Sequence, residues 1–182
     1  MIIKDYVDSL THSWSLVDLD RISEAVQKVQ ECLQSGNQVF VIGNGGSSST
    51  ASHFVADWVK GNREINGVAG KAFCLSDNTP LITAIGNDID FDQIFAYQLR
   101  SYAKSSDLLV CVTGSGNSKN VVKACLEAKS IGMKVVALTG FDGGETLRMA
   151  DFSFHCPVKD MQIVEDMHMS FGHMVIRCHY WD

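Results

Sequence analysis

Two segments of the chain are apolar at every position, Val39–Ile42 and Leu108–Val112. A strand that packs on one face alternates apolar and polar residues, whereas an unbroken apolar run is typical of a parallel sheet covered on both faces. Three further short runs have strand character. The sequence therefore predicts a central five-stranded parallel sheet, with strands at Gln38–Ile42, Ala72–Leu75, Leu108–Val112, Lys134–Leu138 and Phe152–Cys156.

Helical patterns separate these strands. Apolar residues recur three and four positions apart between Leu19 and Leu33, which predicts a helix from about Asp18 that stops before Gly36. The alternation of strand and helix predicts an α/β fold, a flavodoxin-like three-layer α/β/α sandwich with ligands at the carboxyl ends of the strands. No linker divides residues 1–182, so we expect one domain that begins with helices in residues 1–36. The other helices are expected at Ile3–Ser13, Ser47–Lys60, Pro80–Ile85, Gln93–Ala103, Asn117–Ile131 and Met161–Tyr180.

Composition and charge narrow the class of protein. Of the 182 residues, 46% are hydrophobic and 20% are charged, which is ordinary for a globular domain. The net charge of −6 and the lack of a long basic run argue against a nucleic-acid partner. No apolar run is long enough to cross a membrane, so no membrane partner is expected. The six cysteines form no CxxC pair, and we expect them to be reduced core residues of a cytoplasmic protein.

The turn after the first strand carries candidate chemistry. Gly43-Asn-Gly-Gly-Ser47 leads directly into a helix, whose first backbone N–H groups favour an anion. His53 and Asp57 follow on that helix, and their spacing places both side chains on one face. An imidazole and a carboxylate so placed are candidate metal ligands or acid/base groups, although His53 taken alone would more often be a capped or packed histidine than a ligand.

A second turn of the same kind is Thr113-Gly-Ser-Gly-Asn-Ser118. Its hydroxyls and helix-start N–H groups can hold a phosphate without a cation, although an ordinary N-capped helix after a βα loop would have the same sequence. Neither turn contains GxxxxGK[ST], which excludes a P-loop, and Ser48 breaks the GxGxxG spacing of dinucleotide-binding folds. Asp142-Gly143-Gly144 is interpreted as a turn only.

These motifs together resemble those of a known family. Gly43–His53, Ile85–Asp88 and Thr113–Ser118 are similar to motifs of the sugar isomerase (SIS) domain, and most of all to those of phosphoheptose isomerases, which act on sedoheptulose 7-phosphate. The resemblance extends over nearly the whole chain, including the closing helix.

The resemblance implies an aldose–ketose isomerase. Members of the family convert sedoheptulose 7-phosphate to D-glycero-D-manno-heptose 7-phosphate, the first step of heptose synthesis for bacterial surface glycans such as lipopolysaccharide or capsule. They are usually homotetramers with sites at subunit interfaces, and the N-terminal helices of this chain would pack in that oligomer. Many of them bind zinc, so Zn²⁺ or another divalent metal is the implied cofactor.

The resemblance also implies roles for individual residues. Asp57 and His173 would transfer the proton. Asn87 and Asp88 would line the site, although their place after Gly86 is otherwise typical of a plain turn. The implied metal ligands are His53, Asp57, Glu165 and His173. The implied substrate-binding residues are Asn44, Gly45, Gly46, Ser47, Asp57, Asn87, Asp88, Thr113, Gly114, Ser115, Ser118 and Glu165.

Three positions depart from the family pattern. The family usually has glutamate where this chain has Asp57, which shortens the catalytic carboxylate by one methylene; a displacement of about 1 Å can cost on the order of a hundredfold in rate. It usually has glutamine where this chain has Glu165, so the site gains a negative charge beside a phosphate. Gly114 replaces a hydroxyl residue.

The closing helix raises a geometric question. Glu165 and His173 lie eight residues apart, about 12 Å along a straight helix, and helical rotation pairs His173 slightly better with Asp166. We therefore expect Glu165 either to precede the regular helix or to reach the metal from another subunit. His168 is expected either to line the site or to lie on the helix surface.

Aldose–ketose exchange needs a base beside a C–H bond and an electrophile at the oxygens. A carboxylate, an imidazole and a metal ion can provide these. Two alternatives remain: a non-catalytic SIS domain that binds a sugar phosphate or serves as a protein-binding scaffold, and an isomerase for another sugar phosphate.

Overall fold

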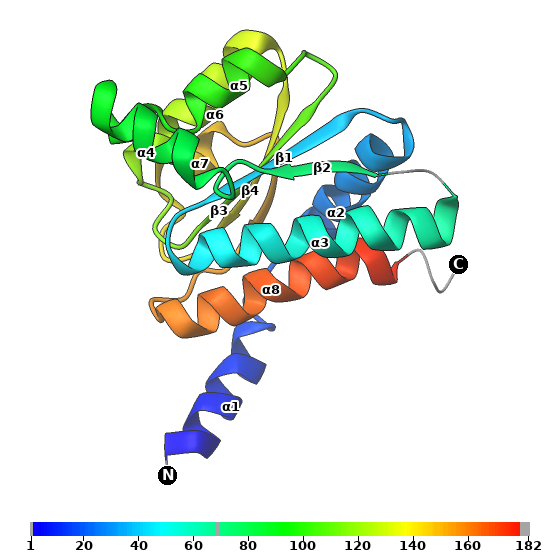
Figure 1. Ribbon diagram of the computed structural model, residues 1–182. Helices are drawn as coiled ribbons and strands as arrows, with labels where there is room; N and C mark the ends of the chain where they lie inside the picture. The colour runs from blue at the N-terminus through cyan, green and yellow to red at the C-terminus, as the bar shows by residue number, and fades with distance from the viewer. Residues whose placement is uncertain (1, 68–69, 179–182) are drawn as a thin grey trace.

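A parallel sheet forms the centre of the computed structural model, which describes residues 2–67 and 70–178 (Figure 1). Its five strands follow the order β2-β1-β3-β4-β5, and every adjacent pair is parallel. The predicted sheet is confirmed, and each end lies within one residue of the expected one. The strands are β1 (Gln38–Gly43), β2 (Lys71–Cys74), β3 (Leu108–Thr113), β4 (Lys134–Thr139) and β5 (Phe152–His155).

Helices cover both faces of the sheet, which confirms the three-layer sandwich (Figure 1). The bounds of the helices are α1 (Ile2–Ser13), α2 (Leu19–Gln34), α3 (Gly46–Asn66), α4 (Thr79–Asp88), α5 (Ala96–Tyr102), α6 (Lys119–Ile131), α7 (Gly144–Met149) and α8 (Met161–Arg177), with a 3₁₀ turn η1 at Phe91–Gln93. Helices α2, α3 and α8 lie on one face, and α4 to α7 on the other. No helix in this described part of the chain is both long and apolar enough to span a bilayer.

The unbroken apolar strands supply two separate cores. In β1, Val39 and Val41 pack toward α2, α3 and α8, while Phe40 and Ile42 pack toward α5 and α6. Successive side chains of a strand point to opposite faces, so a run without polar residues fills both cores at once. This is why the sequence pattern predicted the sheet so closely.

Several helix bounds differ from prediction. Helix α3 continues past Gly61 to Asn66, and Gly61 lets Ile176 of α8 approach closely, since a Cβ there would lie 2.9 Å from that side chain. The interpretation of Asn87 and Asp88 as a turn is wrong, because α4 includes both. The helix predicted at Gln93–Ala103 is divided into η1 and α5.

At the C-terminal side, the short helix α7 begins at Gly144, in the segment interpreted as a turn only. The predicted end of the closing helix at Tyr180 lies outside the described residues.

Helices α3 and α8 run side by side in the same direction and place the site residues (Figure 1). Gly172 of α8 lies so close to Phe54 of α3 that a Cβ would overlap the ring. Trp58, which is fully buried, donates an indole hydrogen bond of 3.0 Å to the Gly172 carbonyl. This close contact brings the outer face of α3 next to the outer face of α8.

Candidate active site

The turn after β1 leaves the start of α3 open. Gly45 is the N-cap residue with a positive φ of 53°, a conformation that suits glycine, and no side chain caps the helix. The first N–H groups of a 21-residue helix therefore face the carboxyl edge of the sheet. The side chain of Asn44 exchanges two hydrogen bonds with Asn120 of α6, a residue that the sequence did not single out.

The turn after β3 is hydrogen-bonded to the start of α7. The carbonyl of Gly116 accepts hydrogen bonds from the backbone and the hydroxyl of Thr146, at 2.9 and 2.8 Å. Gly116 has a positive φ of 68°, and a Cβ there would overlap the Gly143 carbonyl. The first turn of α7, with Gly143 just before it, thus supports the Thr113–Ser118 turn, a role that the sequence did not indicate.

The two turns enclose a pocket of about 200 Å³ at the carboxyl ends of β1 and β3. Among the described residues no lysine or arginine lines it, so its donors are hydroxyls, amides and backbone N–H groups. Ser118, the N-cap residue of α6, does not cap the helix with its side chain. Most of the predicted substrate residues lie here: the lining is Asn44, Ser47, Val112, Thr113, Gly114, Ser115, Ser118, Met161 and Glu165.

Gly114 and Met161 fit together in this pocket. A Cβ on Gly114 would lie 2.5 Å from the Met161 sulfur, so the thioether occupies the space that a hydroxyl side chain would take. The departure at position 114 is therefore matched by a side chain from α8. Asn87 and Asp88 do not line the pocket as described; they hydrogen-bond to one another at the exposed end of α4, at 2.8 Å.

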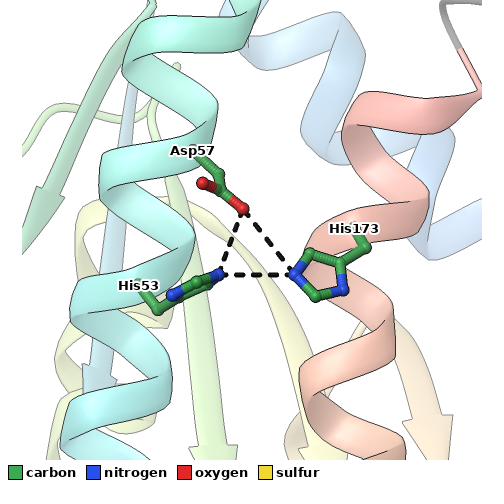
Figure 2. A group of neighbouring side chains, drawn as sticks. All are labelled: His53, Asp57 and His173. Carbon is green, nitrogen blue, oxygen red and sulfur yellow. Dashed lines mark hydrogen bonds and ion pairs between the residues drawn. The ribbon is translucent and has the colours of Figure 1, made fainter.

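His53, Asp57 and His173 form a compact cluster on the outer face of α3 and α8 (Figure 2). The two histidine Nε2 atoms lie 3.3 Å apart. Asp57 Oδ2 lies 3.2 Å from the Nε2 of His53 and 3.8 Å from that of His173. The three side chains are 47%, 41% and 56% exposed, respectively, so solvent reaches the cluster from one side.

This cluster fits a divalent metal. Zinc bound tetrahedrally at roughly 2.0–2.1 Å has ligand atoms about 3.3 Å apart, close to the separations seen here. Two imidazoles and one carboxylate are a common catalytic zinc set that leaves a position for water or substrate. Helical spacing singled out His53 and Asp57, the family resemblance added His173, and the structure brings the three side chains together within one chain.

Glu165 does not join this cluster. Helix α8 is already regular from Met161, so the expectation that Glu165 precedes the regular helix is wrong. Its carboxylate lies beside Gly46 at the start of α3, where a Cβ on the glycine would be 3.0 Å from Oε1. Asp166 faces α1 and accepts a 2.6 Å hydrogen bond from the Tyr6 hydroxyl. Within the described chain, Glu165 therefore belongs to the pocket rather than to the histidines.

Comparisons with known proteins identify the family of this chain. The family model of the SIS domain matches residues 5–140. The probable phosphoheptose isomerase of Thermoplasma volcanium is 34% identical over 175 residues, which cover 96% of this chain and 89% of the relative. The phosphoheptose isomerase of Geobacter sp. (strain M21) is 38% identical over 154 residues, covering 85% and 80%. The chain belongs to the phosphoheptose isomerase family of SIS-domain proteins.

A solved phosphoheptose isomerase structure from Francisella tularensis has the same architecture. It superposes with a TM-score of 0.88 at 30% identity and covers 97% of this chain and 95% of that one. The predictions of an α/β SIS fold and of membership in an aldose–ketose isomerase family are confirmed. The family likeness extends over almost the full length, so both the pocket and the His–Asp–His cluster lie within the shared region.

His168 differs from both sequence interpretations. It is 1% exposed, packs edge-on against Phe154, and neither ring nitrogen has a hydrogen-bond partner among the described residues. Burial lowers the pKa of His168 to about 4; the Thr139 main chain opposes this shift and the His155 ring adds to it. Both expected positions are therefore wrong, because the ring lies in the core as a neutral group.

Proposed function

We propose that the protein converts sedoheptulose 7-phosphate to D-glycero-D-manno-heptose 7-phosphate. The observation that carries this proposal is the succession of two sites along one pair of parallel helices. The pocket, which among the described residues has no lining lysine or arginine and one lining carboxylate, Glu165, lies at the start of α3 and α8, and the cluster lies further along. His53 follows Gly46 by seven residues, or about 10 Å of helix. An open-chain sugar phosphate extends over a similar length.

In this proposal the pocket holds the phosphate end. Thr113, Ser115 and Ser118 donate hydroxyl hydrogen bonds, and the start of α6 adds backbone N–H groups. Ser47 and Asn44 contact the sugar from the first turn, together with Gly45 and Gly46. Asn87 and Asp88 also contact substrate. Because they lie on α4 away from this pocket, they would make that contact only at a site formed with another subunit of the oligomer.

Asp57 and His173 move the proton. Asp57 removes a proton from C1 of the ketose to give an enediolate and returns a proton to C2, while His173 transfers a proton between the two oxygens. An imidazole is suited to this transfer because its ring nitrogens can both donate and accept a proton. The open, half-exposed side of the cluster lets the reacting end approach both groups.

His53, Asp57 and His173 are the residues that would hold a zinc ion or another divalent metal. When bound, such an ion supplies an electrophile that polarises the carbonyl and stabilises negative charge on its oxygen. Glu165, predicted as a further ligand, lies eight residues before His173 on α8, so it would serve only the cluster of a neighbouring subunit.

We infer a homo-oligomer, with four subunits as the expected number. Helix α1 extends away from the sandwich and touches α8 (Figure 1), and it exposes Ile2, Ile3 and Val7, which are 86%, 76% and 53% accessible. Burying these side chains requires a partner surface. The six free cysteines, five of them buried, support a reducing, cytoplasmic setting. Membership in the phosphoheptose isomerase family supports a biosynthetic role in surface-glycan heptose.

The test is turnover of sedoheptulose 7-phosphate followed by NMR, with and without a chelator. We expect the heptose aldose to appear, and Asp57→Asn to lower the rate on the order of a hundredfold or more. Glu64→Gln is the matched control, an exposed carboxylate two turns further along α3. Binding of the sugar phosphate without turnover by the metal-loaded protein would instead support a non-catalytic SIS domain, and turnover of only another sugar phosphate would support a different isomerase.

A further inference from the structure

The side chains of Asn44 and Asn120 form a closed amide pair between the two turns. Asn44 Nδ2 donates to Asn120 Oδ1 at 2.8 Å, and Asn120 Nδ2 donates to Asn44 Oδ1 at 2.9 Å. Asn120 is 2% exposed, and it is separated from Asn44 by 76 positions in sequence. The pair is the side-chain link between the turn after β1 and the first turn of α6.

The orientation of both amides follows from one backbone contact. The N–H of Val121 donates to Asn120 Oδ1 at 2.9 Å, and a backbone N–H cannot donate to an NH₂ group. That atom of Asn120 is therefore its oxygen. The other atom is the NH₂, and its partner on Asn44 must be an oxygen. A flip of either amide would bring like groups together, so the pair is locked in one state.

This fixed orientation determines which hydrogen-bond donor and acceptor of Asn44 remain for a ligand. An asparagine amide has two N–H donors and two acceptor lone pairs, and the pair with Asn120 uses one of each. One N–H and one lone pair remain on Asn44, which lines the pocket, whereas Asn120 does not. The closed pair uses the edge of the amide where donor and acceptor adjoin, so the remaining N–H and lone pair point to opposite sides and can each meet a separate polar group of a ligand, such as two hydroxyls of a sugar.

We propose that Asn120 is a positioning residue that acts through Asn44. Its amide fixes the donor and acceptor of Asn44 toward the sugar and couples the sugar-facing turn to the helix that begins at the phosphate-binding turn. The inference rests on the proposed function only in the identity of the ligand. The geometry of the pair applies to any hydroxylated phosphate ester that enters the pocket.

A double-mutant cycle tests this inference. Asn120→Leu keeps the approximate shape and removes the pair, Asn44→Ala removes the ligand contact, and the double variant measures their coupling. Titration calorimetry gives the Kd of sedoheptulose 7-phosphate and of inorganic phosphate for each protein. Asn120→Asp is the second variant: it keeps acceptors for Asn44 and Val121, sets an oxygen opposite the Asn44 oxygen and adds a negative charge, so it disrupts the pair without changing the side-chain size if the leucine variant does not fold.

We expect each single variant to weaken sedoheptulose 7-phosphate about tenfold, the loss typical of one or two neutral hydrogen bonds. The double variant should be no weaker than Asn44→Ala alone, and Kd for inorganic phosphate should change less than twofold in Asn120→Leu. Gln98→Met is the matched control, because Gln98 is an equally buried amide that donates to two carbonyls away from the pocket. It should lower the melting temperature and leave Kd unchanged.

An unchanged sugar-phosphate Kd in Asn44→Ala or in the Asn120 variants would overturn the inference, as would a double variant about a hundredfold weaker than wild type. Failure of the proposed function gives a different result. If the wild-type protein binds the sugar phosphate without turnover, the proposed isomerase activity is refuted. The double-mutant cycle can still be evaluated, because it uses only Kd values.

Discussion

The buried, unpartnered ring of His168 should make the fold sensitive to acid. Its ordinary pKa is 6.5, and burial lowers the pKa to about 4 in the folded protein. The folded state therefore favours the neutral ring. The contribution of this neutral ring to the free energy of unfolding is fully present above pH 6.5 and is lost as pH falls toward 4. A pKa difference of that size corresponds to a loss of about 3 kcal/mol in the free energy of unfolding at low pH. Proton linkage predicts that about 2 kcal/mol of this loss occurs between pH 7 and pH 5.

The assay is urea unfolding at pH 7, 6 and 5, at one fixed protein concentration because subunit association also contributes. Between pH 7 and pH 5 the free energy of unfolding of wild type should fall by about 2 kcal/mol more than that of His168→Phe. Phenylalanine fits the aromatic contact with Phe154 and cannot be protonated. His12→Gln, an exposed histidine of α1, should follow wild type. Equal pH dependence in wild type and His168→Phe would refute the reasoning.

Three further predictions concern the helix pair, the cluster and assembly. Gly172→Ala places a methyl group against the Phe54 ring, so it should destabilise the fold by about 1–3 kcal/mol or more and lower the melting temperature. An unchanged melting temperature would mean that α8 can shift away from α3 without cost. Asp57→Asn should weaken zinc binding at least about tenfold by calorimetry, and equal affinity would place the metal elsewhere. Ile3→Asp should lower the oligomer mass in light scattering, and retention of the wild-type mass would exclude α1 from the interface.

The sheet was predictable because its strands fill two cores at once. Val39–Ile42 and Leu108–Val112 contain no polar residue, and such runs have few other uses in a chain of ordinary composition. The histidine–carboxylate spacing on α3 was equally informative, because helical periodicity alone places His53 and Asp57 on one face. His173 required the family resemblance, since nothing local distinguishes it from a packed histidine.

Other parts of the site depend on contacts between distant segments. Asn120 pairs with a residue 76 positions away, and no local pattern marks such a contact. Helix α7 is a short element that begins in a glycine-rich turn and supports its neighbour through backbone hydrogen bonds. One signal was available and unused: Asp160 caps α8 by accepting from Gln162 and Ile163, which marks a regular helix well before Glu165.

The most direct test of the account is the isomerisation itself in deuterated water. The metal-loaded protein is incubated with sedoheptulose 7-phosphate in D₂O, and the product is followed by proton NMR and mass spectrometry. Proton transfer at the half-exposed cluster predicts a heptose aldose phosphate that carries solvent deuterium at C2 and is absent with Asp57→Asn. An aldose with only protium at C2, or turnover that survives the loss of the Asp57 carboxylate, would contradict it.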